Sequence, residues 1–409
     1  MTAHTARQEW AARWPLPFVS MLGMSGCAIF AYSSGVLLEP VTAELGWSRT
    51  EFASAFLLQM LAGLVILPTV GLLADRFGPR RIALIGIVPF VACLALLGTV
   101  GQPIWQWWAL GLLFAVAQGL INQPIWIASV VGWFQASRGL ALAVTLAGVG
   151  LGSVIWPLLA AFYLSELGWR LTYVALGLSW AVVVLPMTFL FFRDPLVTAT
   201  AAKAPRAERA SYLKTLANPS LLGLIVAGGL FTCATNAVVM TMVPVLKTKG
   251  FGLAEAAGLA SAIGLAAITG RFVLGYLLDR LPTRPLAVCA FLVPIPAAAL
   301  LIFADGSTAM ALAGCLLLGF SSGAEGDVIA FVAARRFGVR KFASTFAVFT
   351  SFIAVSGSMG PLLSGMSFDR FQSYNALLMI LMPMVACGSL IMAFMPMAPA
   401  NAAAGPDQD

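Results

Sequence analysis

Histidine and charged residues are scarce in this chain of 409 residues, and their scarcity excludes several kinds of function. The one histidine, His4, stands in the N-terminal tail, so a histidine proton relay is excluded. The hydrolase pattern G-x-S-x-G fits GFSSG (319–323), but this stretch lies inside an apolar run and has no histidine partner. The six cysteines lack metal-ligand spacing, and no phosphate-binding loop is present. We therefore expect no enzymatic activity, no cofactor and no metal site.

The shortage of charge also excludes a soluble protein. Only 10% of the residues are charged and 60% are hydrophobic, whereas the surface of a soluble domain needs more charge. The apolar runs are long enough to cross about 30 Å of hydrocarbon as helices. Only helices or closed barrels satisfy the backbone in lipid, and these runs are too long and too apolar for barrel strands. The sequence therefore predicts an all-α polytopic membrane protein.

Twelve transmembrane helices are predicted, in two sets of six. The predicted spans are 15–41, 50–74, 80–101, 104–134, 138–164, 169–192, 219–247, 253–279, 284–305, 308–336, 341–368 and 373–396. The longest polar segment, 193–218, would be a cytoplasmic linker between an N-terminal bundle (1–192) and a C-terminal bundle (219–396). The Ala/Pro/Asp-rich tail (397–409) is predicted to be disordered.

The net charge of +7 could suggest a nucleic-acid partner, but its distribution indicates membrane topology instead. With both termini in the cytoplasm, 17 of the 23 basic residues fall on the cytoplasmic side. The first apolar run is too long for a cleavable signal and lacks a small-residue cleavage site, so we expect it to remain as the first span. We predict a multi-pass protein of the cell (inner) membrane, monomeric in the lipid bilayer, with no nucleic-acid partner.

The two halves repeat at a constant offset of 204 residues, which is half the chain length. The matches are Gly71, Leu73, Asp75 and Arg76 with Gly275, Leu277, Asp279 and Arg280; Pro40, Gly46 and Trp47 with Pro244, Gly250 and Phe251; and Pro157, Leu158 and Leu159 with Pro361, Leu362 and Leu363. Six spans in each half make both halves enter the membrane in the same direction. They are therefore predicted to be parallel repeats about an axis along the membrane normal.

The stretch GLLADRFGPRR (71–81) contains G-x-L-x-D-R-x-G-x-R-R and resembles the signature loop of the major facilitator superfamily. The resemblance implies that this loop locks the two halves when the transporter opens outward and releases them when it opens inward. The implied gate residues are Gly71, Asp75, Arg76, Arg80 and Arg81, with Asp279 and Arg280 in the second copy. Pro282 and Pro285 make the second copy depart from the pattern. The alternative role for these arginines is plain anchoring at the cytoplasmic headgroups.

Three further stretches resemble the bacterial branch of the monocarboxylate transporter family, whose relatives include oxalate:formate antiporters. They are YSSGVLLEPVTAELGWSRTEF (32–52), WFQASRGLALAVTLAGVGLG (133–152) and GAEGDVIAF (323–331). Many members carry an acidic residue and a glycine early in span one, where this chain has GMSGCAIFAY (23–32) instead. In that family an arginine of span eight binds the substrate carboxylate, and ITGRFVLG (268–275) matches its position.

Arg271 is therefore the predicted carboxylate clamp, since an ionisable residue within a span is costly and its guanidinium offers a planar fork. The alternative is a structural salt bridge to span ten. Family members often carry an aspartate one turn earlier, where this chain has Ala267. The proton would then depend on Glu325 or Asp327, which point about 200° apart on one helix. We favour Glu325, which shares a face with Ser321 and Ser322, as the proton carrier and Asp327 as a structural partner.

Other predicted substrate contacts lie on spans one, four and seven, which line the cavity in this superfamily. They are Tyr32, Gln118, Asn122 and Asn236. A single deep cation suits one carboxylate better than two. We therefore predict a secondary carrier that moves a small organic monocarboxylate with a proton by alternating access. The alternatives are a carboxylate exchanger, an efflux carrier of the same fold, or a receptor that binds the acid without moving it.

Overall fold

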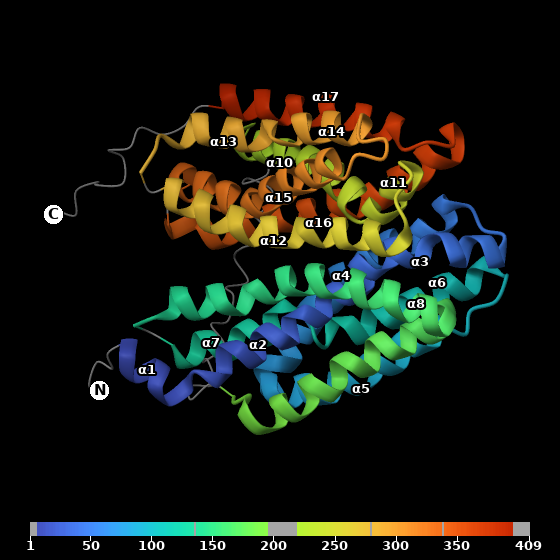
Figure 1. Ribbon diagram of the computed structural model, residues 1–409. Helices are drawn as coiled ribbons and strands as arrows, with labels where there is room; N and C mark the ends of the chain where they lie inside the picture. Colours follow the sequence, from blue (N-terminus) through green and yellow to red (C-terminus); the bar gives the residue numbers. More distant parts are fainter. Residues whose placement is uncertain (1–5, 135, 195–218, 279, 338, 396–409) are drawn as a thin grey trace. The chain divides into compact units, whose positions relative to one another are not determined.

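The chain is helical throughout the part that the computed structural model describes, namely residues 6–134, 136–194, 219–278, 280–337 and 339–395 (Figure 1). Its helices are α1 (Ala6–Arg13), α2 (Pro15–Ser25), η1 (Gly26–Ala28), α3 (Ile29–Leu45), α4 (Arg49–Phe77), α5 (Pro79–Leu97), α6 (Ile104–Gly119), α7 (Gln123–Trp133), α8 (Arg138–Phe191), α10 (Pro219–Val239), α11 (Met242–Thr248), α12 (Leu253–Leu278), α13 (Thr283–Leu292), α14 (Pro294–Ile302), α15 (Thr308–Phe337), α16 (Val339–Phe371) and α17 (Asn375–Phe394). The prediction of an all-α membrane protein is confirmed.

Nine stretches of the described chain are long and apolar enough to cross a membrane. One of them, Leu140–Phe191, carries two predicted spans, because Gly168 has φ 73° and ψ 167° within α8 and breaks the helix there. α15 and α16, which contain 30 and 33 residues, correspond to predicted spans ten and eleven. The helices therefore follow the twelve predicted spans.

Several predicted spans are broken, which the hydropathy pattern did not show. Predicted span four is divided into α6 and α7, and predicted span nine into α13 and α14. At the first break, the side chain of Asn122 accepts a hydrogen bond of 2.7 Å from the backbone N–H of Gln123 and so caps α7. Breaks of this kind are tolerated within a membrane protein where other groups satisfy the released backbone.

The 204-residue repeat is visible in the backbone as well as in the sequence. Gly46 and Gly250 both have positive φ, of 71° and 92°. The N–H of Trp47 donates to the carbonyl of Thr42 at 3.1 Å, and the N–H of Phe251 donates to the carbonyl of Leu246 at 3.3 Å. Both copies therefore end a helix with the same six-residue hydrogen-bonded turn. Glycine is preferred in this turn because it adopts positive φ without a steric penalty.

A second pair of turns at the same offset is formed at Gly168 in the first copy and at Gln372 in the second. Gln372 has φ 52°, and among the described residues it is the one non-glycine position with positive φ. Its N–H donates to the carbonyl of Phe368 at 2.7 Å, so the turn is closed as at a helix C-terminus. The first copy uses a glycine at this turn, whereas the second copy holds a side chain in a conformation that favours glycine.

Replacing Gln372 with glycine is expected to stabilise the protein by about 1 kcal/mol, because it removes the steric cost of the left-handed conformation. The melting temperature of the purified protein in detergent should rise, by about 2–4 °C for a domain of this size. The opposite change at the paired turn, Gly168→Gln, should lower it. A lower melting temperature for Gln372→Gly would show that the glutamine side chain stabilises the turn more than its backbone costs.

Contacts divide the described chain into two compact units. The first unit is formed by the described residues of Met1–Ala202, with Met240–Lys247 and Phe251–Gly264. The second is formed by those of Lys203–Val239, Thr248–Gly250 and Leu265–Asp409. Most of the predicted linker and the whole of the predicted tail lie outside the described residues, and the predicted domain boundaries stay a prediction.

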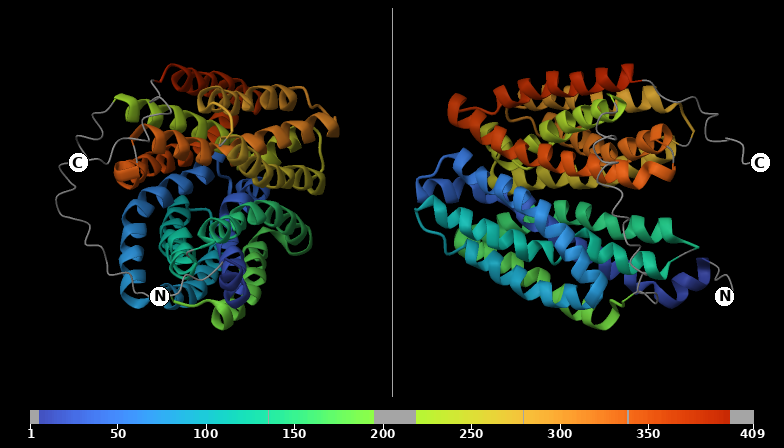
Figure 2. Two further views of the ribbon diagram at one scale, coloured as in Figure 1. Left: turned by 90° about the vertical axis from the view of Figure 1, so that its left-hand side faces the viewer. Right: turned by 180° about the vertical axis from the view of Figure 1, so that it is seen from behind.

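Within the first unit, the short helix α1, which lies next to the N-terminus in the right-hand view of Figure 2, contacts the residues just before α8. The carboxylate of Glu9 accepts hydrogen bonds of 3.0 Å from the backbone N–H groups of Ala136 and Ser137, and one of 3.0 Å from the Ser137 hydroxyl. The guanidinium of Arg13 lies 3.6 Å from the ring centre of Trp133. A carboxylate is stabilised beside the N-terminus of a helix, so Glu9 acts as a cap of α8 supplied by another helix.

Close helix packing in the first unit depends on small residues of α8. A Cβ at Gly152 would lie 2.7 Å from the Cβ of Ala28 and 2.9 Å from the carbonyl oxygen of Ser25. A Cβ at Gly148 would overlap the backbone of Met21. The glycines of AGVGLGS (147–153) therefore let α8 lie against α2 and η1, as small residues do at helix contacts in membranes.

Candidate functional site

Two helices of the second unit bring a carboxylate and a hydroxyl together. Thr232 of α10 lies in contact with the carboxylate of Glu325 of α15, and its hydroxyl is also 2.9 Å from the carbonyl oxygen of Gly228. Both side chains are half-buried. A threonine hydroxyl has one proton to donate and can also accept, so it can serve the two oxygens in either order. Glu325 is thus held at a hydrogen-bonded position within the helix bundle.

Asn236 lies one turn beyond Thr232 on the same face of α10, and α16 covers both residues through a glycine. A Cβ at Gly357 would lie 2.8 Å from Nδ2 of Asn236 and 3.1 Å from Cγ2 of Thr232. Nδ2 of Asn236 points to the carbonyl oxygen of Gly357 at a long distance of 3.5 Å. The predicted residue Asn236 therefore belongs to the same group of polar side chains as Glu325.

Gly360 continues the same contact between α10 and α16. A Cβ at this position would lie 2.6 Å from the carbonyl oxygen of Cys233 and 2.7 Å from the backbone nitrogen of Ala237. The glycines of SGSMGP (356–361) therefore let α16 pack closely against α10 within the second unit.

Arg271 lies on α12 next to a close contact between α12 and α15. A Cβ at Gly270 would lie 2.9 Å from the carbonyl carbon of Phe320, and a Cβ at Gly323 would overlap the backbone of Ala267. The side chain of Arg271 is exposed. The arginine predicted as the clamp is thus on the helix that packs directly against α15, which carries both predicted carboxylates.

Of those two carboxylates, only Glu325 has a described side chain. Asp327 belongs to α15, and its side chain lies outside the described part of the structure. Glu325 was favoured because it shares a face with Ser321 and Ser322, but Ser321 does not mark a hydrated surface. Ser321 is 1% exposed, and its hydroxyl donates to the carbonyl of Ala290 at 2.7 Å. This serine marks a helix contact and not a hydrated surface.

The predicted substrate-binding residues of the first unit lie on α3, on α6 and at the start of α7. Gln118 of α6 is half-buried, and its amide donates to the carbonyl of Cys27 at 3.3 Å. The amide oxygen of Asn122 is engaged as the cap of α7. Tyr32 of α3 is half-buried. The structure therefore gives Gln118 and Asn122 backbone partners, and their role in binding a substrate stays a prediction.

The signature loop is held by an acidic residue that the sequence analysis missed. Gly78 has φ 87°, and a Cβ there would lie 2.7 Å from the carboxylate of Asp194, the last described residue after α8. The same carboxylate accepts a hydrogen bond of 2.8 Å from the backbone N–H of Arg80, and the carbonyl of Asp194 accepts one of 2.9 Å from Trp133. Asp194 thus supplies the N-terminal cap of α5, and glycine at 78 leaves room for it.

The arginines of the loop differ in their surroundings. The guanidinium of Arg80 donates to the carbonyl of Phe189 at 2.6 Å, so Arg80 is anchored within its own unit. Arg76 and Arg81 are exposed, and the guanidinium of Arg280 lies 4.1 Å from the ring centre of Tyr276. The side chain of Asp75 and the whole of Asp279 lie outside the described residues.

Gly71, the first of the implied gate residues, shows no close helix contact in the described part of the structure. No atom of the described residues lies within 4 Å of a Cβ built there.

Removing the carboxylate of Asp194 is expected to loosen the loop. Asp194→Ala deletes a helix cap, which costs about 1 kcal/mol, and the melting temperature in detergent should fall by about 2–4 °C. Asp194→Asn is the matched control, since its amide oxygen can still accept from Arg80, and it should retain most of the stability. Equal losses in both variants would mean that the charge, and not the cap, stabilises this end of the unit.

Comparisons with known proteins agree with this architecture. The family model described as Major Facilitator Superfamily matches residues 18–361. An "MFS-type efflux pump" of Mycolicibacterium smegmatis is 28% identical over 385 residues, covering 90% of this chain and 86% of that protein. A "Chloramphenicol resistance protein" of Streptomyces lividans is 30% identical over 308 residues, covering 72% of this chain and 75% of that protein.

Solved structures show the same fold at low sequence identity. The D-xylose-proton symporter is similar with a TM-score of 0.73 at 15% identity, covering 93% of this chain and 97% of that chain. The nucleoside transporter NupG is similar with a TM-score of 0.74 at 14% identity, covering 93% and 98%. With a family model that matches most of the sequence and a helical fold shared with solved transporters, the chain belongs to the major facilitator superfamily and is a membrane-embedded transporter of small molecules.

Proposed function

We propose that this transporter moves a small organic monocarboxylate together with a proton by alternating access. The observation that carries the proposal is that α12 presents Arg271 beside its contact with α15, while α15 holds Glu325 against Thr232 in the same unit. A cation for the carboxylate and a group that can take up the proton thus lie on neighbouring helices. The resemblance of 133–152 and 323–331 to the monocarboxylate branch supports the same choice.

Arg271 would bind the carboxylate through its guanidinium. Two parallel N–H groups match the two oxygens of a carboxylate, and such charge-assisted pairs are about twice as strong as neutral hydrogen bonds. An arginine within a span costs several kcal/mol by insertion scales, so a functional use for it is the default expectation. In this proposal the substrate supplies one negative charge and Arg271 one positive charge.

Asp327 would partner Arg271 when no substrate is bound. Gly323 and Ala267 lie in contact, and Asp327 and Arg271 each follow one turn later in α15 and α12. Both helices are even-numbered spans and cross the membrane in the same direction, so one turn further along each keeps the two residues near each other. Substrate binding would then displace Asp327 from the guanidinium.

Glu325 would carry the proton through its contact with Thr232. When Glu325 is ionised, the Thr232 hydroxyl donates to the carboxylate. When Glu325 is protonated, the carboxylic acid donates to the Thr232 oxygen, and the hydroxyl donates to the carbonyl of Gly228, from which it is 2.9 Å. Glu325 and Thr232 can therefore share a hydrogen bond in both protonation states.

The location we propose is the cell (inner) membrane, with both termini in the cytoplasm. The excess of basic residues on one side supports this orientation. The loop 71–81 would then lie on the cytoplasmic side, where the exposed Arg76 and Arg81 would take part in the gate that the family resemblance implies.

An efflux carrier is the second candidate, and the names of two relatives favour it. The mycobacterial relative is named an efflux pump, and the Streptomyces relative a chloramphenicol resistance protein. Export of a neutral or cationic drug would not need a cation at Arg271, so the two candidates differ in what they require of this residue.

The test is a substrate screen in proteoliposomes that contain a pH-sensitive dye. Short, hydroxylated and aromatic monocarboxylates are added outside, beside dicarboxylates and chloramphenicol, and protein-free vesicles correct for leak. Saturable acidification of the lumen by a few monocarboxylates is the expected result. Labelled uptake only into vesicles preloaded with an acid would indicate an exchanger. Transport of chloramphenicol but of no acid would favour the efflux candidate and contradict the proposal.

A further inference from the structure

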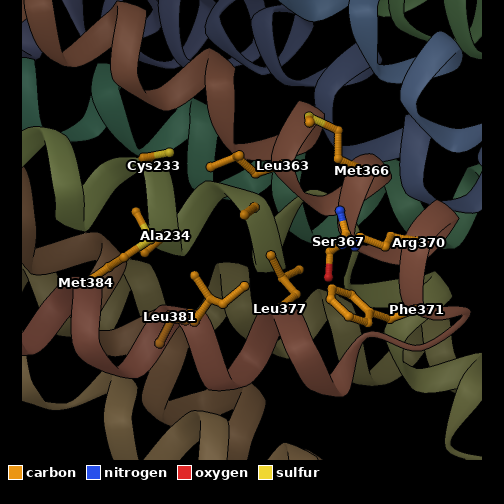
Figure 3. A pocket seen from close by; sticks show the side chains of 12 residues that line it. Cys233, Ala234, Leu363, Met366, Ser367, Arg370, Phe371, Leu377, Leu381 and Met384 are labelled. Atoms are coloured by element: carbon orange, nitrogen blue, oxygen red, sulfur yellow. The ribbon is translucent and has the colours of Figure 1, made fainter.

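A cavity of about 210 Å³ lies inside the second unit, between α10, α16 and α17, and it belongs to none of the groups described above (Figure 3). Apolar side chains form most of its wall, among them Leu363 of α16 and Leu381 of α17. Its volume exceeds that of the roughly 150 Å³ apolar cavity that holds one benzene molecule. Side chains at its rim, Met366 and Ile380, are 52% and 48% exposed, so the cavity opens at the surface of the unit.

Two polar groups interrupt this apolar wall. The hydroxyl of Ser367 is buried and has no hydrogen-bond partner among the described residues, and the residue is only 7% exposed. In Figure 3 its oxygen points toward Phe371 and Leu377, which also line the cavity. A buried hydroxyl without a partner costs free energy, so a bound acceptor would stabilise it. Arg370, in the last turn of α16, places an exposed cation at one end of the cavity.

The order of these groups along α16 defines the chemistry of the ligand. Measured along the axis of α16 from Arg370 toward the middle of the helix, Ser367 lies about 4.5 Å away and Leu363 about 10 Å away. The ligand therefore needs an anion, then a hydrogen-bond acceptor, then an apolar chain. A glycerophospholipid has these parts in this order, as phosphate, ester carbonyl and acyl chain.

We propose that this cavity binds one acyl chain of an anionic glycerophospholipid. The phosphate pairs with Arg370, an ester carbonyl accepts the hydrogen bond of Ser367, and the chain lies between Leu363 and Leu381. Arginine is suited to phosphate because its planar fork donates two parallel hydrogen bonds. The bilayer already solvates an acyl chain, so burial alone gives no preference for the cavity. The preference comes from the charge of Arg370, the hydroxyl of Ser367 and the dispersion contacts restored when the void is filled.

The test uses the full-length protein in nanodiscs with two photoactivatable lipids that carry the same diazirine acyl chain. One is phosphatidylglycerol, which is anionic, and the other is phosphatidylcholine, which is zwitterionic. Cross-linked peptides are mapped by mass spectrometry. We expect adducts concentrated in the α16 and α17 segments that line the cavity, with phosphatidylglycerol labelling about fivefold above phosphatidylcholine, as one arginine near a membrane surface provides.

Three variants separate the parts of the proposal. Arg370→Gln should remove the preference for the anionic lipid. Arg170→Gln, which changes a half-buried arginine of the first unit that pairs with Glu44, should leave the preference unchanged. Ala234→Leu fills part of the cavity and should reduce labelling by both lipids. The proposal would be overturned if the two lipids labelled the protein equally and Arg370→Gln did not change that labelling. So would adducts spread evenly over all helices, or displacement of the lipid by a short-chain monocarboxylate, which would assign the cavity to another ligand.

Discussion

Replacing Arg271 with alanine is expected to abolish monocarboxylate transport while leaving the protein folded. The proposed clamp loses its cation, and truncating one partner of a hydrogen-bonded charge pair costs about 2–5 kcal/mol, which corresponds to at least about a 30-fold loss. The side chain is exposed within its unit, so the fold should not depend on it. Initial rates of labelled uptake into proteoliposomes, with the melting temperature measured on the same preparation, check both parts.

Two further variants control this experiment. Arg271→Lys keeps the charge but not the planar fork, so it should recover only part of the activity. Arg284→Ala removes an exposed arginine of the same unit, whose guanidinium donates to the carbonyl of Met395 at 3.0 Å, and should leave transport near the wild-type rate. Normal uptake by Arg271→Ala would end the role of this residue as a clamp.

Replacing Glu325 with glutamine is expected to separate proton movement from substrate movement. Glutamine has the shape of glutamate and can still exchange hydrogen bonds with Thr232, but it cannot take up or release a proton. Exchange of labelled for unlabelled acid should therefore continue, while acidification of the lumen falls to the level of protein-free vesicles. Both quantities are measured in the same vesicle preparation.

The matched comparison is Asp327→Asn, which should impair proton movement less than Glu325→Gln does, because Asp327 is proposed as the structural partner of Arg271. Thr232→Val keeps the volume of the side chain and removes its hydroxyl, so it should weaken proton coupling without abolishing exchange. Equal effects of Glu325→Gln and Asp327→Asn, or a reversed order, would contradict the assignment of the proton to Glu325.

The spans and the repeat were predictable because long apolar runs and motifs at a constant offset depend on local sequence alone. The breaks within spans were not, because a cap such as Asn122 adds one polar residue to an apolar run. The paired turns at Gly168 and Gln372 also escaped prediction. A glutamine at positive φ carries no local signal, since most non-glycine residues avoid that conformation.

The partners of the candidate site residues were predictable only in part. Charge within a span drew attention to Arg271 and Glu325, but Thr232 resembles the many threonines that bond to their own helix. Asp194 was assigned to the linker because it stands in the longest polar segment, 193–218. Its contact with Arg80 joins residues 114 positions apart in the chain, and no local pattern predicts such a contact.

The most direct test of the proposed function is accumulation of a labelled, poorly permeant monocarboxylate driven by a pH gradient alone. The membrane potential is clamped at zero, and Arg271→Ala vesicles serve as the baseline. A singly charged acid that moves with one proton is electroneutral, so an acidic exterior should drive accumulation above the external concentration, and a clamped potential of either sign should not change the result. No accumulation above the baseline, or accumulation that follows the potential instead of the pH gradient, would contradict proton-coupled monocarboxylate transport.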